Sequence, residues 1–396
     1  MKNPEIRFID DNIDWQDENL SDALTERNTT SYKNNGLEHV SLTKDGVIPK
    51  SERYERDFLV TTKNKKYKIT KINDICYNPA NLKFGVICRN KYKDGIFSPI
   101  YITFETAENH MPNFVELIVT NPAFIRASLK YQEGTVYERM AVSPDNLLKM
   151  PISVPNIDFQ EKIAKIFDNI DIKIKEEESL IQKLKDTKSA LLIKMFPQEN
   201  QSIPELRFDG FTNDWEQRKF GSLYQKSSEK NNGSIGIDKN ITVATMQFKP
   251  DVKVTTEEYL KTYYTFNIGD IAFEGHHSKE FMFGRFVAND IGNGIVSHIF
   301  AVFRPYVNYD LKYWKYAIHN ESIMCHILSR CTKASTMMHD LVTCDFLNDS
   351  ILVPSIEEQR KIGAFLDNLD SLITLHQRKL DKLKEVKAAL LEKLLV

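Results

Sequence analysis

The sequence has no long apolar run and no paired cysteine motif. None of its apolar stretches approaches the ~20 residues that cross a bilayer, and the first residues, MKNPEIRFIDD, lack the apolar core of a secretory signal. The five cysteines are odd in number and show no CxxC spacing, which indicates reduced thiols and no zinc site. We therefore expect a cytoplasmic protein without a bound metal.

Catalytic motifs are equally scarce. The sequence has no P-loop, no GxSxG and no glycine-rich cofactor loop. NPAF (121–124) comes close to the N-P-P-[FY] motif of amino-methyltransferases, but Ala123 is in third place and the segment lies in a helical pattern. A helix start, with Asn121 as N-cap and Pro122 in the first turn, is the favoured interpretation. These absences argue against an enzyme, with a degenerate methyltransferase or nuclease kept as an alternative.

An excess of one charge is also lacking. The chain has 53 basic and 55 acidic residues and a net charge of −2, whereas many nucleic-acid-binding domains are strongly basic. The charge is uneven, however. Residues 1–26 hold eight acids and two bases, and KNKKYKITK (63–71) holds five lysines and no acid. A neutral total therefore hides a local basic segment.

The sequence does contain an internal repeat. PNIDFQEKIAKIFDNID begins at Pro155 and PSIEEQRKIGAFLDNLD at Pro354, an offset of 199 (354 minus 155), and eight of the seventeen positions are identical. GIFSPIYITF (95–104) is echoed by GIVSHIFAVF (294–303) at the same offset. A repeat of this kind predicts two equivalent halves.

The segments after Pro155 and Pro354 have the pattern of a coiled coil. Positions from 163 to 195, spaced alternately by four and three, are apolar in eight of ten cases, and so are their equivalents from 362 to 394. The polar exceptions are also equivalent: Glu177 with His376, and Lys188 with Lys387. The two helices are expected to pair antiparallel; two separate seams, each packing on its own domain, is the alternative.

The rest of each half reads as a mixed α/β (α+β) domain. Strands are predicted at 101–104, 241–248 and 295–303, and helices at 113–131 and 311–330. The predicted organisation is two internally repeated globular domains joined by two long antiparallel coiled-coil helices. Its boundaries are 1–155 for domain 1, 156–196 for helix 1, 197–203 for a linker, 204–354 for domain 2 and 355–396 for helix 2.

These motifs together resemble the specificity (S) subunit of Type I restriction–modification systems. The resemblance covers the whole chain. It rests on the doubled PE-[IL]-RF…DW starts, on Asp74 and Asp270 in INDI and IGDI, on the G-I-x-S stretch and on the two helix starts. It implies two target recognition domains that read the halves of a bipartite double-stranded DNA target, each followed by a spacer helix.

The resemblance also implies partners. Two modification (adenine methyltransferase) subunits would supply S-adenosylmethionine chemistry, and restriction (translocase and nuclease) subunits would use ATP and magnesium. No cofactor is expected in this chain, which would itself be non-catalytic. A two-headed scaffold for proteins rather than DNA is the rival hypothesis.

A scaffold that both halves share cannot encode two different half-sites, so we predict that the divergent loops read bases. Asn can pair with adenine and Lys can reach guanine acceptors, whereas other lysines and arginines would contact phosphates. The predicted DNA-binding residues are Lys63, Lys65, Lys66, Asn78, Asn81, Lys83, Arg89, Lys91, Lys93, Thr135, His276, His277, Ser278, Lys279 and Ser335. The predicted docking residues for the modification subunits are Gln160, Lys162, Gln359 and Lys361.

Overall fold

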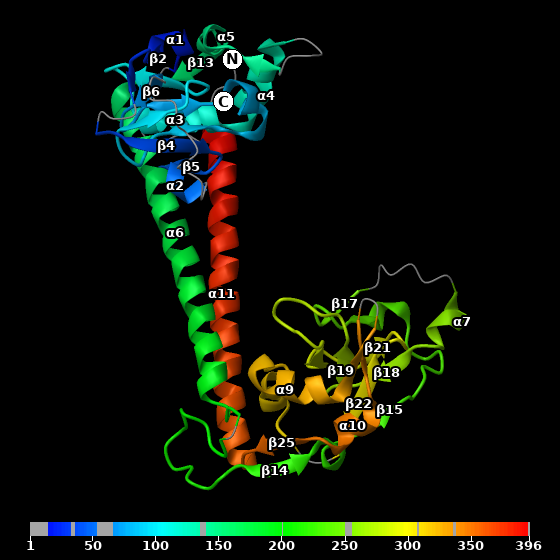
Figure 1. The fold of residues 1–396 in the computed structure, drawn as a ribbon. Coiled ribbons are helices and arrows are strands. Elements are labelled where there is room, and N and C mark those ends of the chain that lie inside the picture. Colours follow the sequence, from blue (N-terminus) through cyan, green and yellow to red (C-terminus); the bar gives the residue numbers. More distant parts are fainter. Residues whose placement is uncertain are drawn as a thin grey trace. The chain divides into compact units, whose positions relative to one another are not determined.

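The fold was analysed in a computed structural model, which describes residues 15–32, 36–53, 66–134, 140–199, 201–249, 256–306, 309–335 and 338–394. The chain divides into two compact units. Unit 1 comprises Met1–Glu177 with Lys379–Val396, and unit 2 comprises Glu178–Arg378. Each long helix, α6 (Ile157–Lys194) and α11 (Ile356–Leu394), therefore contributes to both units (Figure 1). The domain boundaries drawn from the sequence stay a prediction.

Unit 1 is built on a four-stranded and a five-stranded sheet, with short helices around them. Besides the first part of α6 and the last part of α11, its elements are β1 (Gln16–Asn19), α1 (Leu20–Ala23), β2 (Leu24–Glu26), β3 (Thr30–Tyr32), β4 (Glu38–Thr43), β5 (Gly46–Pro49), α2 (Lys50–Arg53), β6 (Lys66–Thr70), β7 (Ile75–Tyr77), the 3-10 helix η2 (Pro79–Phe84), β8 (Ile87–Arg89), β9 (Gly95–Phe97), β10 (Ile102–Thr106), α3 (Pro112–Thr120), α4 (Pro122–Ser128), η3 (Leu129–Tyr131), β11 (Gln132–Glu133), β12 (Ala141–Val142), α5 (Pro144–Leu148) and β13 (Pro151–Val154).

Unit 2 repeats much of this order with a smaller accessory sheet. Besides the remaining parts of α6 and α11, its elements are β14 (Glu216–Lys219), η4 (Phe220–Ser222), β15 (Tyr224–Ser227), η5 (Ile237–Lys239), β16 (Ile241–Thr242), β17 (Gln247–Phe248), α7 (Glu257–Leu260), β18 (Tyr264–Phe266), β19 (Ile271–Glu274), β20 (Arg285–Ala288), β21 (Gly294–Val296), β22 (Ala301–Pro305), α8 (Leu311–Ala317), α9 (Glu321–Cys331), β23 (Thr332–Ala334), β24 (His339–Leu341), α10 (Thr343–Asn348) and β25 (Ser350–Val353).

The two units share their sheet topology. The four-stranded sheet has the order β2-β10-β7-β8 in unit 1 and β15-β22-β19-β20 in unit 2. The strand before each long helix pairs with the first strand of its half, β13 with β1 and β25 with β14. These equivalences confirm the predicted internal repeat and the mixed α/β class.

Four elements predicted as continuous are in fact divided. Helix 113–131 breaks at Pro122, which has no N–H to donate, and helix 311–330 breaks where Asn320 caps α9 through its side chain. Strand 241–248 is a hairpin between β16 and β17, and strand 295–303 is two strands separated by a turn. The apolar run continues through each break, so periodicity alone did not locate it.

The predicted seam of the two long helices is confirmed by burial. All ten predicted seam positions from 163 to 195, of which the last directly follows α6, and all ten from 362 to 394 in α11 are buried or half-buried, while most positions between them are exposed. Local caps start each helix: Asn156 Oδ1 accepts a hydrogen bond from Phe159 N, and Ser355 Oγ accepts one from Glu358 N. An apolar stripe of this length is stable only when it is covered.

The polar residues in the seam form ion pairs that fix its register. In unit 2, Lys188 Nζ lies 2.6 Å from Asp370 Oδ1. In unit 1, Lys387 pairs with Asp171. The two aspartates are 199 residues apart, and so are the two lysines. The two ion pairs are therefore equivalent interactions, one in each repeat. Both pairs require the antiparallel arrangement that the sequence predicted, because in each the early residue of one helix meets the late residue of the other.

Each unit buries one main core that includes part of both long helices. In unit 1, Ile163, Phe167 and Leu394 belong to the core that also covers the four-stranded sheet. In unit 2, Leu366 of α11 belongs to the core, and Leu191 and Leu192 of α6 pack against it. The five cysteines are free, and none of the helices in the described ranges is long and apolar enough to cross a membrane.

Candidate nucleic-acid interface

The divergent loops lie at the same end of the four-stranded sheet in both units. In unit 1, Tyr77 at the end of β7 pairs with Ile102 at the start of β10. In unit 2, Phe273 near the end of β19 pairs with Ala301 at the start of β22. The segments that follow β7 and β19 are therefore next to the turns that precede β10 and β22. We call this the loop end of each unit.

The first predicted reading loop, after β7, forms the 3-10 helix η2. Asn78 is buried and caps η2, its Oδ1 accepting a hydrogen bond from Ala80 N at 3.2 Å. Asn81 is half-buried and Lys83 is exposed, with its ammonium 5.0 Å from the centre of the Phe84 ring. Of these residues, Lys83 is thus the most open to a ligand, and base contact by all three stays a prediction.

Lys66 also lies at the loop end of unit 1. Lys68 on β6 pairs with Phe97 on β9, so the antiparallel register places Lys66 beside the turn after β9. The side chain of Lys66 is exposed. Lys63, Lys65 and Thr135 lie outside the described residues.

The structure puts the other predicted phosphate contacts at the opposite end of the sheet. Arg89 pairs in the ladder with Ile75 at the start of β7, and its guanidinium lies 3.1 Å from Glu116 and 3.8 Å from Asp168 on α6. Lys91 is 2.9 Å from the same Glu116 carboxylate. These cations therefore do not gather with Lys66 and η2, and their charges are balanced within unit 1.

Lys93 is likewise compensated. Its ammonium lies 2.6 Å from Glu38, whose other contact is the Tyr92 hydroxyl at 2.9 Å. The hydrogen bond from Lys93 is the main cause that lowers the pKa of Glu38, which keeps this carboxylate charged beside the ammonium. A phosphate at this place would have to displace Glu38.

The second predicted reading loop, after β19, is exposed along its whole length. His276, His277, Ser278 and Lys279 are all exposed. Ser278 shapes the loop, since its Oγ accepts hydrogen bonds from Glu280 N and Phe281 N. The imidazoles of His276 and His277 stack with centroids 6.0 Å apart. Four side chains that could donate or accept are thus presented together.

The hairpin β23–β24 extends this loop. Met338 forms a bridge with His276, and His339 on β24 donates its N–H to Gly275 O at 2.8 Å. The His339 ring lies edge-on to His277 at 6.0 Å. A Cβ at Gly275 would overlap the carbonyl oxygen of His339, so only glycine permits this approach.

The predicted residue Ser335 closes the hairpin β23–β24. Its N–H and its hydroxyl both donate to Met338 O, at 2.8 and 3.0 Å. Met338 and His339 had no sequence signal except their nearness to Ser335. Within the described ranges, no group of three or more His, Cys, Asp or Glu side chains could hold a metal ion.

The repeated aspartates stiffen the scaffold. Asp74 is buried and accepts two hydrogen bonds from Arg27, at 2.8 and 2.9 Å. Asp270 is buried and accepts from Arg304, with the closest contact at 3.0 Å from Nη2. The hydrogen bond with its aspartate is the main cause that raises the pKa of each arginine, whereas burial raises the pKa of both aspartates.

The repeated glutamines at the helix starts are also structural. Gln160 is buried; its Oε1 accepts from Met111 N at 3.0 Å and its Nε2 donates to Pro155 O at 2.9 Å. Gln359 is buried in the same way and its Nε2 donates to Pro354 O at 3.1 Å. Both carboxamides are satisfied inside their own unit.

The two predicted docking lysines at the helix starts remain open to a partner. Lys162 and Lys361 are exposed, each with its ammonium within 5 Å of an aromatic ring, Phe159 and Phe211 respectively. They are better placed than the glutamines for a docking contact, which stays a prediction.

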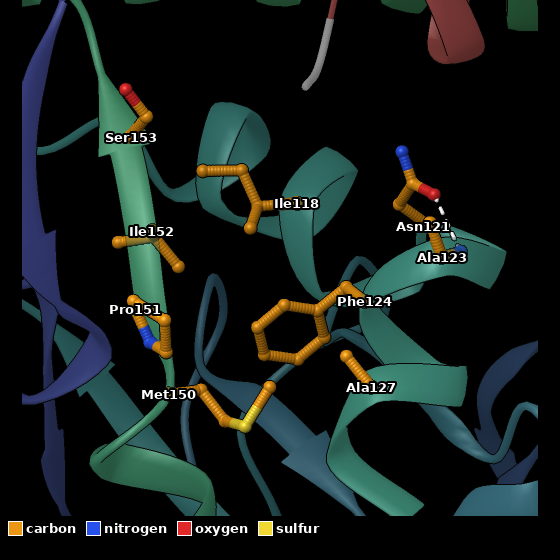
Figure 2. Close-up of a pocket in the computed structure, with 9 residues that line it drawn as sticks. All are labelled: Ile118, Asn121, Ala123, Phe124, Ala127, Met150, Pro151, Ile152 and Ser153. Atoms are coloured by element: carbon orange, nitrogen blue, oxygen red, sulfur yellow. Dashed lines mark hydrogen bonds between the residues drawn. The ribbon is translucent and has the colours of Figure 1, made fainter. Parts of the chain in front are cut away.

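The NPAF segment lines a small apolar pocket. The pocket, of about 240 Å³, is formed mainly by Ile118, Phe124, Met150 and Ile152 (Figure 2). Asn121 Oδ1 accepts a hydrogen bond from Ala123 N at 2.8 Å, as the dashed line in Figure 2 shows. The predicted helix start is confirmed, because this side chain caps α4.

Comparison with known proteins agrees with this architecture. Residues 213–385 match the family described as "Type I restriction modification DNA specificity domain". The S subunit of a Type I restriction–modification system from M. genitalium superposes with a TM-score of 0.59 and 14% identity, over 100% of this chain and 99% of that chain.

A second solved chain, from a study of complex assembly and conformational transition of the type I R-M system, has a TM-score of 0.50 and 15% identity. The match covers 96% of this chain and 97% of that chain. No curated protein matches the sequence. The predicted resemblance to the Type I specificity subunits is thereby confirmed.

Proposed function

We propose that this protein selects the DNA sequence on which a Type I restriction–modification complex acts. It has the fold of a Type I specificity subunit, and its second half matches the DNA specificity domain of that family. Unit 1 reads one half of a bipartite duplex target and unit 2 reads the other. The unread gap between the half-sites follows from reading by two separate domains.

One observation carries this proposal. The two units have the same order of strands in the four-stranded sheet, but the loops that follow β7 and β19 at the loop end differ. Six residues of η2 follow β7 in unit 1, whereas an exposed histidine loop and a hairpin tied to it occupy the corresponding end of unit 2. A shared scaffold with divergent loops is what two different half-sites require, because bases are read by side chains that reach their edges.

The chemistry belongs to partners in this proposal. Modification subunits methylate adenine with S-adenosylmethionine, two of them matching the two units, and restriction subunits use ATP and magnesium. Within this chain Asn121, the residue closest to a methylase motif, is engaged as a helix cap. The exposed Lys162 and Lys361, at equivalent helix starts, would contact the modification subunits.

The test is a map of N6-methyladenine across the genome of the source cell, with and without this gene. We expect one bipartite motif to lose methylation when the gene is deleted and to regain it on complementation. Unchanged methylation at every motif would contradict the proposal. Salt-dependent DNA binding by the assembled complex separates it from the protein-scaffold alternative, which predicts none.

A further inference from the structure

Two isoleucines are exposed at equivalent positions of the two units. Ile100 has 60% of its surface exposed and Ile299 has 70%, and the two are 199 residues apart. Both lie two residues after the serine of the repeated G-I-x-S motif, in a position whose role the proposed function does not explain. Isolated exposed apolar residues are common, but the same residue kept exposed at the same place in two divergent halves needs a reason.

A rigid turn presents each isoleucine. Tyr101 N donates to Ser98 O at 3.1 Å, and Phe300 N donates to Ser297 O at 3.1 Å, so each isoleucine is the third residue of a closed four-residue turn. The second residue of the turn differs between the units, Pro99 in unit 1 and His298 in unit 2, whereas the third residue is isoleucine in both. The aromatic residue that follows anchors the turn: Tyr101 is buried and Phe300 is half-buried.

Both turns lie at the loop end. In unit 1 the turn leads into Ile102, which pairs with Tyr77 just before Asn78. In unit 2 the pairing of Phe273 with Ala301, continued by two residues, places Ile299 across from Gly275 at the start of the histidine loop. Each exposed isoleucine therefore adjoins the loop that we propose reads the half-site.

We propose that Ile100 and Ile299 are apolar wedges that press against the stacked bases of the two half-sites. This inference rests on the proposed function. The half-sites differ while the isoleucines are the same, so the contact is independent of base sequence, as contacts of apolar side chains with a base stack are. Methylation of adenine requires the base to leave the stack, and a wedge at each half-site lowers the cost of that step.

A second pair of isoleucines provides a matched control. Ile72 and Ile268 are also equivalent and are 55% and 53% exposed. They lie at the opposite end of the sheet, where Ile72 N donates a hydrogen bond to Asp94 Oδ1 and Ile268 N donates one to Asn293 Oδ1. They have the same residue type, the same repeat symmetry and similar exposure, but they do not adjoin the reading loops.

The experiment uses the complex of the full chain with its modification subunits. The probe is a duplex with the bipartite motif found by methylation mapping, with 2-aminopurine replacing the target adenine of one half-site. Ile100→Ala should weaken binding roughly tenfold, the effect of losing one buried aliphatic side chain, and should reduce the fluorescence gain in the half-site read by unit 1 only. Ile299→Ala should do the same for the other half-site.

Controls separate the outcomes. Ile100→Leu should retain binding, and Ile72→Ala and Ile268→Ala should bind like the unmodified chain. Unchanged affinity and fluorescence in Ile100→Ala would overturn the wedge proposal. A changed methylation motif would also overturn it, because it would indicate that Ile100 reads a base. Loss of subunit assembly in size-exclusion chromatography would overturn it as well, because it would indicate that Ile100 contacts a protein. If the unmodified complex methylates no bipartite motif, the proposed function itself fails.

Discussion

At the scale of single residues, each unit uses buried polar groups to hold its turns. Asn90 and Asn289 are fully buried, and each donates to two backbone carbonyls of the turns that flank it. Each turn before the aspartate contains a residue with positive φ, Asn73 at 70° and Gly269 at 91°, a conformation that Asn and Gly tolerate best. Buried polar groups of this kind are costly unless satisfied, so these networks make the end of the sheet opposite the loop end rigid.

The ion pair between Asp270 and Arg304 should matter for stability and not for sequence preference. Asp270→Asn leaves the Arg304 guanidinium, 26% exposed, without its buried charged partner. Because solvent compensates part of the loss, we expect unit 2 to lose about 2 kcal/mol of unfolding free energy, less than a fully buried pair would. Urea unfolding measures the loss, and the methylated motif should stay the same.

An exposed pair provides the comparison for that variant. Lys382 and Glu385 are 73% and 69% exposed, so Lys382→Ala should change the unfolding free energy by less than about 0.5 kcal/mol. Equal losses in the two variants would contradict the structural role given to Asp270.

His319 should make unit 2 sensitive to mild acid. Its Nδ1 donates to Phe286 O at 3.0 Å, and burial lowers its pKa below the ordinary value of 6.5. The hydrogen bond with Phe286 O and the charge of Glu274 raise the pKa, and nearby Arg285 and Lys188 lower it, but the net shift is downward. The lowered pKa means that the folded state favours neutral His319. Below pH ~6.5 the unfolded chain takes up a proton at this histidine more readily than the folded chain does. The folded state is therefore destabilised as the pH falls through that value, and it loses nothing from this group above it.

The measurement is urea unfolding between pH 7 and pH 5. The unmodified chain should lose stability with a slope of up to about 1.4 kcal/mol per pH unit from this one group, and His319→Asn should have a shallower dependence over the same range. Parallel curves for the two proteins would show that His319 titrates normally.

At the scale of elements, the two long helices carry matched charges in an apolar seam. Asp171 with Lys387, and Lys188 with Asp370, are half-buried pairs. Sliding one helix along the other would separate both pairs, so the pairs help to specify register as polar residues in coiled coils do. Asp370 also accepts the Tyr316 hydroxyl at 2.7 Å, which ties the seam to α8 of unit 2.

Reversing one charge should destabilise the seam, and reversing both should restore it. We expect Lys387→Asp, which faces Asp171, to lower the thermal midpoint by several degrees, corresponding to about 1 kcal/mol or more. Adding Asp171→Lys should recover most of the loss. A double variant as unstable as the sum of the two single variants would show that the contact does not determine the register.

At the scale of the whole molecule, two domains with the same scaffold should be independent readers. Replacing residues 275–282 with a different loop should change one half of the methylated motif and leave the other half intact. The reason is that this loop follows β19 of unit 2, whereas the reading loop of unit 1 follows β7. Single-molecule sequencing of N6-methyladenine in cells with the grafted chain measures the result. A change in both halves, with the complex still assembled, would contradict independent reading.

The sequence by itself determined the repeat, the family resemblance and the seam, since each depends on residues at fixed spacing along the chain. Lys188 and Lys387 already stood out as equivalent polar positions, and the helix start at Asn121 followed from its neighbours. Such features are local or periodic, so a linear pattern contains them.

Only the tertiary structure decided which of the predicted site residues lie together. Arg89, Lys91 and Lys93 are near Lys83 in sequence, yet strand pairing places them at the opposite end of the sheet beside carboxylates. Gln160 and its equivalent, predicted as surface docking residues, are buried by backbone contacts with residues up to 49 positions away. Pairings between distant segments set which end of a strand and which side of a helix a side chain occupies, and no local pattern encodes them.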